Sequence, residues 1–349
     1  MSTKTAQRPP SFDLDLYSDD VQGDIFPHLD AIRRTAPLVY IPQYNVYYSA
    51  THEVVRSVMN KADIFSSAGG IGLIDIRTQN NPRMKGRRAA LPFMDAPDHT
   101  PLRNILVKIL APGAMKRMQS VADEWAERLV DRAIERRHVD LVQDVVRPFT
   151  VNVMGDAVGF PKEGRDHLVI LGNVTLASVG KLDERLQDAV TAAVQANTFE
   201  WMAQVCKRES LAAGGIGRDI FAAVDRGEID EETAEELVSL FVNGGVDTTF
   251  TTISKGFKNF LDHPDQWERL VDDPGMAKSA FEEVMRYNVS VQQAYRVVTR
   301  DTEIAGFLLP EGSRIGLAIS GAGRDPAKFD HPDQFDIGRS AAGHIGFGS

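Results

Sequence analysis

The 349-residue sequence is short of cysteine, of positive charge and of long apolar runs. Its one cysteine, Cys206, excludes an intrachain disulfide and fits a reducing cytoplasm. A net charge of -10 argues against nucleic acid as a partner. The amino-terminal stretch MSTKTAQRPPSFDLDLYSDD is polar and has no apolar run that could serve as a signal peptide or membrane anchor. We therefore expect a cytoplasmic protein with no membrane partner.

Nucleotide-binding loops and internal repeats are also missing. The stretch GGIG occurs at Gly69 and again at Gly214, but neither copy follows a clear strand or precedes the Lys-Ser/Thr pair of a phosphate cradle. No internal repeat is found. Apolar content of 43% and charged content of 25% are ordinary for a globular protein.

Helical periodicity dominates the sequence between residues 99 and 288. Short β-rich runs at 38–41 and 45–49 flank PQY, a pattern typical of a hairpin, and AYRVVT, TEIAGFLL and SRIGLAIS follow the helical part. We predict one mainly α domain over 1–349, with a helical body at 99–288 and a small β-sheet from about 38–49 and 295–319. The expected helices span 51–60, 99–110, 114–137, 140–158, 163–177, 183–209, 231–261 and 276–288, and a long polar loop covers 66–88.

The longest expected helix contains FVNGGVDTTF, which is poorly suited to a helix interior. Each glycine costs roughly 1 kcal/mol relative to alanine, and Asp247 with the two threonines after it adds to that cost. Gly244 shares a face with Asp247 and Thr248, so it leaves a hollow one turn before a carboxylate and a hydroxyl. Such a hollow can hold a small ligand or water. The alternative is a helix crossing that requires small residues.

Five stretches in fixed order resemble the cytochrome P450 monooxygenases. They are DAPDHTPLR (a heme-edge helix), GGVDTT (the oxygen-binding helix), Glu283-Val284-Met285-Arg286 (a Glu-x-x-Arg pair), RDPAKFDHPDQFD (the irregular segment) and HIGFGS (the opening of the heme loop). The resemblance covers nearly the whole chain. It implies the cytochrome P450 fold, heme b with a cysteine thiolate on the iron, and O2 as co-substrate.

Four positions match those that hold the heme propionates in this family. His99 and Arg103 are four residues apart on one helical face, where two cationic donors can grip carboxylates. The resemblance adds Arg296 and His344 to this group, and it assigns Gly244 and Phe347 to the heme contact. Taken one at a time, His99 and Arg103 also fit a helix-start histidine and a solvated arginine.

Glu283 and Arg286 form an i,i+3 pair, which by itself is common and weak on an exposed helix. The resemblance implies a buried pair that locks the irregular segment beneath the heme. The family often adds an arginine where this chain has Gln334, and Arg339 is the candidate substitute.

Proton delivery would come from Asp247 and Thr248. A hydroxyl backed by a carboxylate and water can supply the protons that O–O cleavage requires. The oxidising chemistry itself belongs to the heme.

HIGFGS places the expected heme-ligand cysteine a few residues beyond Ser349. Cys206 cannot replace it, because WMAQVCKRES is helical and has no glycine loop to face the sulfur. We therefore expect the chain to be incomplete at its carboxyl end, and the 349-residue form alone to be inactive and to bind heme weakly or not at all. The alternatives are a truncated heme-less remnant or binding protein without catalysis, and a family member that carries out a rearrangement.

The substrate interpretation depends on a narrower resemblance. PLVYIPQYNVYYSATHEVV, FSSAGGIGL and LAPGAMK resemble the bacterial branch that oxidises para-substituted benzoic acids, including by O-demethylation. Arg87 and Arg88 are the candidate carboxylate-binding residues, although a solvated loop explains them equally well. Ser239 and Leu240 occupy the place of that branch's arginine–serine pair.

Leu176 and Val179 stand where that branch has pocket aromatics. This pattern favours a roomier pocket and an aromatic substrate that is different from, and larger than, those benzoic acids. The expected activity is hydroxylation or O-demethylation of a small aromatic compound, with or without a carboxylate, using O2 and two electrons. The resemblance also implies electrons from a ferredoxin and its flavoprotein reductase.

Overall fold

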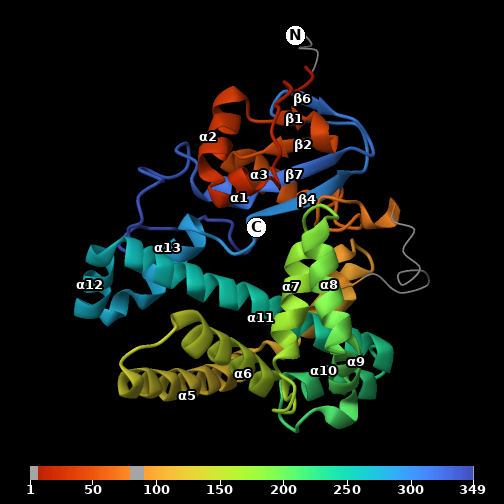
Figure 1. Cartoon of the computed structure of the whole chain (residues 1–349). Helices are drawn as coiled ribbons and strands as arrows, with labels where there is room; N and C mark the ends of the chain where they lie inside the picture. Colours follow the sequence, from red (N-terminus) through yellow and green to blue (C-terminus); the bar gives the residue numbers. More distant parts are fainter. Residues whose placement is uncertain (1–6, 79–89, 349) are drawn as a thin grey trace.

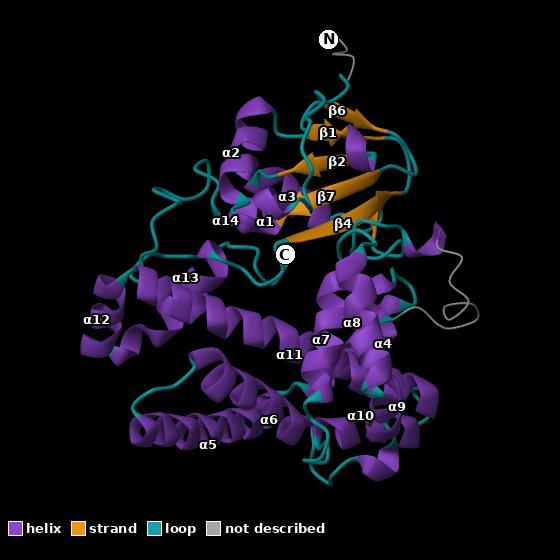
Figure 2. Cartoon of the chain, in the orientation of Figure 1, coloured by secondary structure: helices purple, strands orange, loops and turns teal. Residues whose placement is uncertain are grey.

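The computed structural model describes residues 7–78 and 90–348. Figures 1 and 2 show a helical body on one side and a β-sheet with short helices on the other. The helices are α1 (Asp19–Gly23), α2 (Phe26–Thr35), α3 (His52–Met59), α4 (His99–Ile109), α5 (Pro112–Arg136), α6 (Arg147–Val158), α7 (His167–Ser178), α8 (Glu184–Gln195), α9 (Thr198–Val205), α10 (Ile216–Asp225), α11 (Glu231–Asp262), α12 (Pro264–Asp272), α13 (Ala277–Tyr287) and α14 (Ile319–Gly323).

The main sheet joins the two ends of the chain, as the sequence predicts. Its strand order is β1-β2-β7-β4-β3. The first two strands form the predicted antiparallel hairpin, and β2 then pairs in parallel with β7. Asn45 closes the hairpin turn in the left-handed region, at φ 52°. The strands are β1 (Val39–Ile41), β2 (Val46–Ser49), β3 (Phe65–Ser66), β4 (Gln293–Val298) and β7 (Arg314–Ala318), and β5 (Thr302–Ile304) with β6 (Phe307–Leu309) forms a separate hairpin.

The long helix α11 organises the helical body. It contacts α6, α7 and α10 along one part of its length and α12 and α13 along another. Figure 1 shows it crossing the molecule from the α12–α13 end toward α7 and α8, with α5 and α6 alongside. Its buried residues Leu237, Val238 and Val242 join the largest apolar core. Within the described ranges, the helices are too short or too polar to span a membrane.

The structure corrects several helix predictions. The helix expected over 183–209 is broken into α8 and α9, because Asn197 adopts a left-handed conformation at φ 56°. The helix expected at 140–158 begins with a π-helical turn, Leu141–Val146, capped by the Asp140 carboxylate. Helices α1, α2, α10, α12 and α14 were not predicted. The first and last of these have five residues each, and the other three begin at or next to a proline or glycine, signals that also mark loops.

Candidate active site

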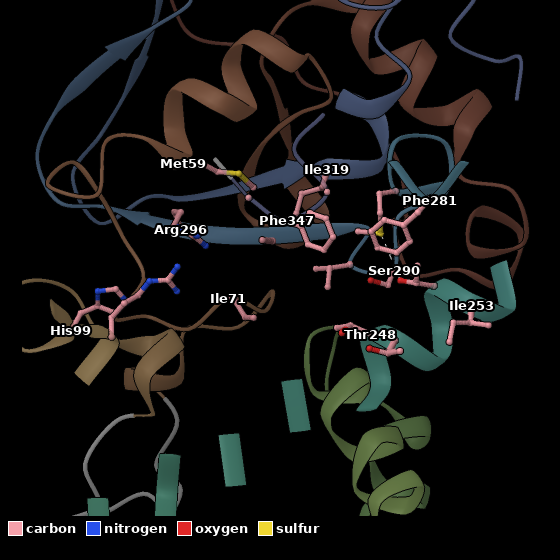
Figure 3. A pocket seen from close by; sticks show the side chains of 18 residues that line it. Met59, Ile71, His99, Thr248, Ile253, Phe281, Ser290, Arg296, Ile319 and Phe347 are labelled. Atoms are coloured by element: carbon pink, nitrogen blue, oxygen red, sulfur yellow. Dashed lines mark hydrogen bonds between the residues drawn. The ribbon is translucent and has the colours of Figure 1, made fainter. Parts of the chain in front are cut away.

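A cavity of about 700 Å³ lies between α11, α4, β4 and the carboxyl-terminal segment. Figure 3 shows His99 and Arg296 at one end of it and Thr248 and Ile253 at the other. Ile319 and Phe347 add apolar wall. The cavity thus has a cationic end and an end that carries a hydroxyl.

The cationic end combines three side chains that are far apart in the sequence. His99 begins α4, Arg103 follows one turn later, and Arg296 lies on β4. Neither the His99 ring nor the Arg103 guanidinium hydrogen-bonds to another described residue. Arg296 uses one nitrogen on the Tyr295 carbonyl at 2.8 Å, and burial lowers the pKa of its guanidinium. Cations with free donors on one edge of a cavity suit a ligand that carries carboxylates.

A second cavity, of about 530 Å³, adjoins the first and shares His99, Arg103 and Thr249 with it. It runs along α11 past Gly244 and Gly245. A Cβ added at Gly244 would meet nothing within 4 Å, whereas one added at Gly245 would overlap the Met154 methyl on α6. The hollow predicted from the sequence therefore lies at Gly244. The alternative, a helix crossing that requires a small residue, applies to Gly245, where α11 packs closely against α6.

Asp247 and Thr248 face different parts of the molecule. Thr248 lines the larger cavity, and its Oγ1 donates to the Gly244 carbonyl at 2.7 Å. Asp247 is only 7% exposed, lines neither cavity, and lies against Gly172 of α7. Its Oδ2 has no hydrogen-bond partner among the described residues. Burial raises the pKa of this carboxyl to about 7. The side chain can therefore exchange a proton near neutral pH.

Thr252 is a cavity residue that the sequence analysis missed. It lies one turn after Thr248, is buried, and lines the same cavity. Its Oγ1 lies 3.8 Å from the Met285 sulfur on α13. The i,i+4 spacing from Thr248 was the available signal.

The Glu283–Arg286 pair is fully buried on α13. Arg286 Nε and Nη2 donate to the two Glu283 oxygens at 2.7 and 2.8 Å. Arg339 Nε lies 3.5 Å from Glu283 Oε1, so the substitute proposed from the sequence stands next to the pair. The Arg286 guanidinium also donates to the main-chain carbonyl of Gly323, at the end of α14, and to those of Pro332 and Gln334 in the irregular segment.

The two expected heme contacts in the carboxyl-terminal segment are placed differently. Phe347 is 72% exposed, lines the larger cavity and stacks on Phe281 with ring centroids 6.1 Å apart. His344 does not line that cavity, and its Nε2 lies 2.7 Å from Glu282 Oε2. The structure thus brings three of the four expected propionate contacts together.

The expected substrate residues are scattered. Arg87 and Arg88 lie outside the described residues. Leu176 is 47% exposed on α7, and the Val179 carbonyl accepts a hydrogen bond from Leu73 N at 2.8 Å. Ser239 Oγ accepts one from Asn243 at 3.2 Å. Of the described members of this set, only Leu240 lines a cavity discussed above.

The side chains around the two cavities can be compared with those that a heme requires. The cationic end of the larger cavity fits the carboxylate edge of that group. Cys206, however, is buried in the helical core, and burial raises the pKa of its thiol to about 12. It lines neither cavity. Among residues 7–78 and 90–348, no group of three histidine, cysteine or acidic side chains could hold a metal ion. The described residues therefore include cations that fit the carboxylate edge of a heme, but no cysteine that lines either cavity.

Comparison with known proteins identifies a family. The cytochrome P450 family model matches residues 275–341. The chain is 33% identical to cytochrome P450 CYP199A2 of Rhodopseudomonas palustris, over 97% of this chain and 82% of the relative. It is 27% identical to a steroid C26-monooxygenase of Rhodococcus jostii, over 97% and 74% of the two chains.

Solved structures share the fold. The crystal structure of P450BioI in complex with an acyl carrier protein carrying hexadec-9Z-enoic acid matches with a TM-score of 0.82 at 22% identity, over 95% of this chain and 86% of that one. CYP109E1 from Bacillus megaterium, in complex with testosterone, matches with a TM-score of 0.79 at 24% identity, over 95% and 85%.

Proposed function

The chain belongs to the cytochrome P450 family, and from that premise we propose that it hydroxylates or O-demethylates a small aromatic compound with O2 and two electrons. Members of this family are heme-thiolate monooxygenases, and the family and mainly helical fold predicted from the sequence are confirmed. One observation carries the proposal. The Thr248 hydroxyl and three cationic side chains converge on one cavity.

The roles of the residues follow from that arrangement. His99, Arg103 and Arg296 would hold the carboxylates of the heme, because they lie along one edge of the cavity and carry donors that the other described residues leave unused. When bound, the heme supplies the activation of O2. Thr248 Oγ1 holds a proton at the opposite end of the cavity. Asp247, the neighbouring residue on α11, can exchange protons near neutral pH and would replace that proton.

The aromatic substrate is supported by the stretches that resemble the benzoate-oxidising branch. Ile253, Ile319 and Phe347 give the cavity apolar walls that suit an aromatic ring. Arg87 and Arg88 would bind a carboxylate on substrates that carry one. The proposal includes a ferredoxin with its flavoprotein reductase as electron donors, and a cytoplasmic setting that the single cysteine favours.

Replacing Thr248 by alanine tests the proton role. The variant should bind substrate as before but divert reduced O2 to peroxide, lowering product formed per NADH consumed by about tenfold. Thr251→Ala, which is also on α11 but lines neither cavity, is the matched control. Equal coupling in the wild type and in Thr248→Ala would remove this hydroxyl from the mechanism.

Replacing Arg87 and Arg88 by alanine tests the substrate class. Binding of 4-methoxybenzoate should weaken by about tenfold, because a charge-assisted bond is lost, while binding of its methyl ester should change little. Isothermal titration calorimetry measures both. Lys116→Ala with Arg132→Ala, two exposed positions on α5, controls for the loss of two positive charges. Equal losses for acid and ester would mean that the two arginines are only a solvated surface.

One observation favours a second candidate, a binding protein without catalysis: the only cysteine lines neither cavity. The absorbance spectrum of the reduced, CO-bound protein separates the two functions. A thiolate-type spectrum supports the monooxygenase. Purified protein that binds the aromatic acid but incorporates no heme supports the alternative.

A further inference from the structure

The Asp247 carboxyl occupies a notch on α7 that exists only because residue 172 is glycine. A Cβ added at Gly172 would overlap Asp247 Oδ1 and would lie 2.5 Å from its Cγ and 2.9 Å from its Oδ2. All three atoms of the carboxyl group therefore approach the same small surface. Gly172 is itself buried in the middle of α7, and this helix packs along α11.

Within the described ranges, no charged group compensates the Asp247 carboxyl. On α7 the one titratable residue is His167, whose ring bonds to Thr198. On α6, which contacts both α7 and α11, Arg147 pairs with Asp166 at 3.0 Å and Asp156 pairs with Arg165 at 2.8 Å. Loss of hydration is accordingly the cause of the raised pKa of Asp247.

We propose that Gly172 is a positioning residue, which admits the Asp247 carboxyl to a dry notch on α7 and so holds it away from water beside the cavity-facing Thr248. A side chain at position 172 would force either α7 or the carboxyl to move. A role of Gly172 in proton delivery rests on the function proposed above. The position of the Asp247 carboxyl in the notch does not. A glycine that served only to bring two helices together would not depend on Asp247.

A double-mutant cycle separates these two roles. Gly172→Ala should lower the Tm by about 5 °C in the wild-type background, because the new methyl overlaps the carboxyl. In an Asp247→Ala background the same change should cost less than half as much, since the space is free. Gly256→Ala, whose Cβ would meet nothing nearer than Val284 at 3.6 Å, should cost the same in both backgrounds. An equal cost of Gly172→Ala in both would overturn the proposal.

Infrared titration measures the carboxyl directly and needs no cofactor. The difference between the wild type and Asp247→Asn isolates the protonated carboxyl band, whose midpoint should lie near pH 7. In Gly172→Ala the midpoint should fall by at least about one pH unit, because displacement admits water. An unchanged midpoint would overturn the proposal.

The exposed neighbour Asn173→Ala controls for disturbance of α7 and should leave the midpoint in place. If Gly172→Ala alone fails to fold, recovery of folding in Gly172→Ala with Asp247→Ala supports the proposal, and failure of both variants overturns it. If Gly172→Ala shifts the titration midpoint of Asp247 but does not change the product formed per NADH consumed, Asp247 has no role in proton delivery. Its position in the notch would still be supported.

Discussion

Replacing Arg286 by methionine should remove the centre of the most deeply buried polar network described above. The guanidinium makes two charge-assisted bonds to Glu283, at 2.7 and 2.8 Å, and three more to main-chain carbonyls of the segment 323–334. Both side chains of the pair are 0% exposed. Methionine can fill much of the volume, but it offers none of these donors.

The magnitude follows from what the change leaves behind. Breaking a buried pair by removing one partner costs about 3–5 kcal/mol, because the other charge remains uncompensated. Here Glu283 keeps Arg339 at 3.5 Å and the Asp336 amide at 3.0 Å, so the lower end of that range applies to the charge. The carbonyls that lose their donor add about 1 kcal/mol or more. We expect a total loss of about 4 kcal/mol in the free energy of unfolding.

Urea unfolding at fixed pH measures this loss, with three comparisons. The double variant Glu283→Met with Arg286→Met should be about 1–2 kcal/mol more stable than Arg286→Met alone, because no buried charge is left unpaired. Arg286→Lys should recover little, since one ammonium cannot replace the bidentate fork. Lys258→Met, which breaks an exposed pair with Asp262 on α11, should cost less than about 1 kcal/mol. A loss below about 1 kcal/mol for Arg286→Met would refute this account of the network.

Two further predictions concern α11. Asp247 has a folded pKa of about 7 against an ordinary 3.8, so its contribution to stability is complete below about pH 4 and is lost as the pH rises through 7. The wild type should lose about 2–3 kcal/mol of its free energy of unfolding between pH 5 and pH 8, and Asp247→Asn should not show this loss. Urea unfolding measures it, with Asp262→Asn as the exposed control. The same pH dependence in the wild type and in Asp247→Asn would contradict the raised pKa. Gly245→Ala should destabilise by about 1–3 kcal/mol because the new methyl overlaps Met154, whereas Gly244→Ala should be neutral or up to about 1 kcal/mol stabilising. Similar unfolding free energies for the two alanine variants would show that the crossing of α11 and α6 readily adjusts.

Local signals account for the parts of the fold that were predicted well. The sequence analysis placed the longest helix at 231–261, and α11 spans Glu231–Asp262. Its length, its apolar periodicity and the Asp230 cap are all encoded within the segment itself. The hairpin around Pro42–Tyr44 was predicted on the same kind of signal, two β-rich runs around a short turn.

Similar local signals gave wrong helix boundaries where one residue type fits both a helix and a break in it. Asn197 looks like an ordinary polar position in a helical run, yet its left-handed backbone separates α8 from α9. Asparagine tolerates that conformation better than most residues, but tertiary packing decides whether it adopts it. No helix was predicted between 209 and 231, where two adjacent glycines interrupt the helical pattern, yet α10 begins directly after Gly215.

By itself, the sequence determined the local spacings on which the site predictions depend: His99 and Arg103 share one face of α4, and Glu283 and Arg286 share one face of α13. The roles predicted for these residues, and for Asp247 and Thr248, came from the resemblance to the family, because spacing alone also fits solvated side chains. Tertiary structure alone decided where each side chain is directed. The Asp247 carboxyl lies against α7, whereas Thr248 lines the cavity. His344 pairs with Glu282 and does not join His99, Arg103 and Arg296 at the cavity. These contacts join segments far apart in the chain. Their geometry depends on how closely two elements pack, and no pattern within either segment specifies that distance.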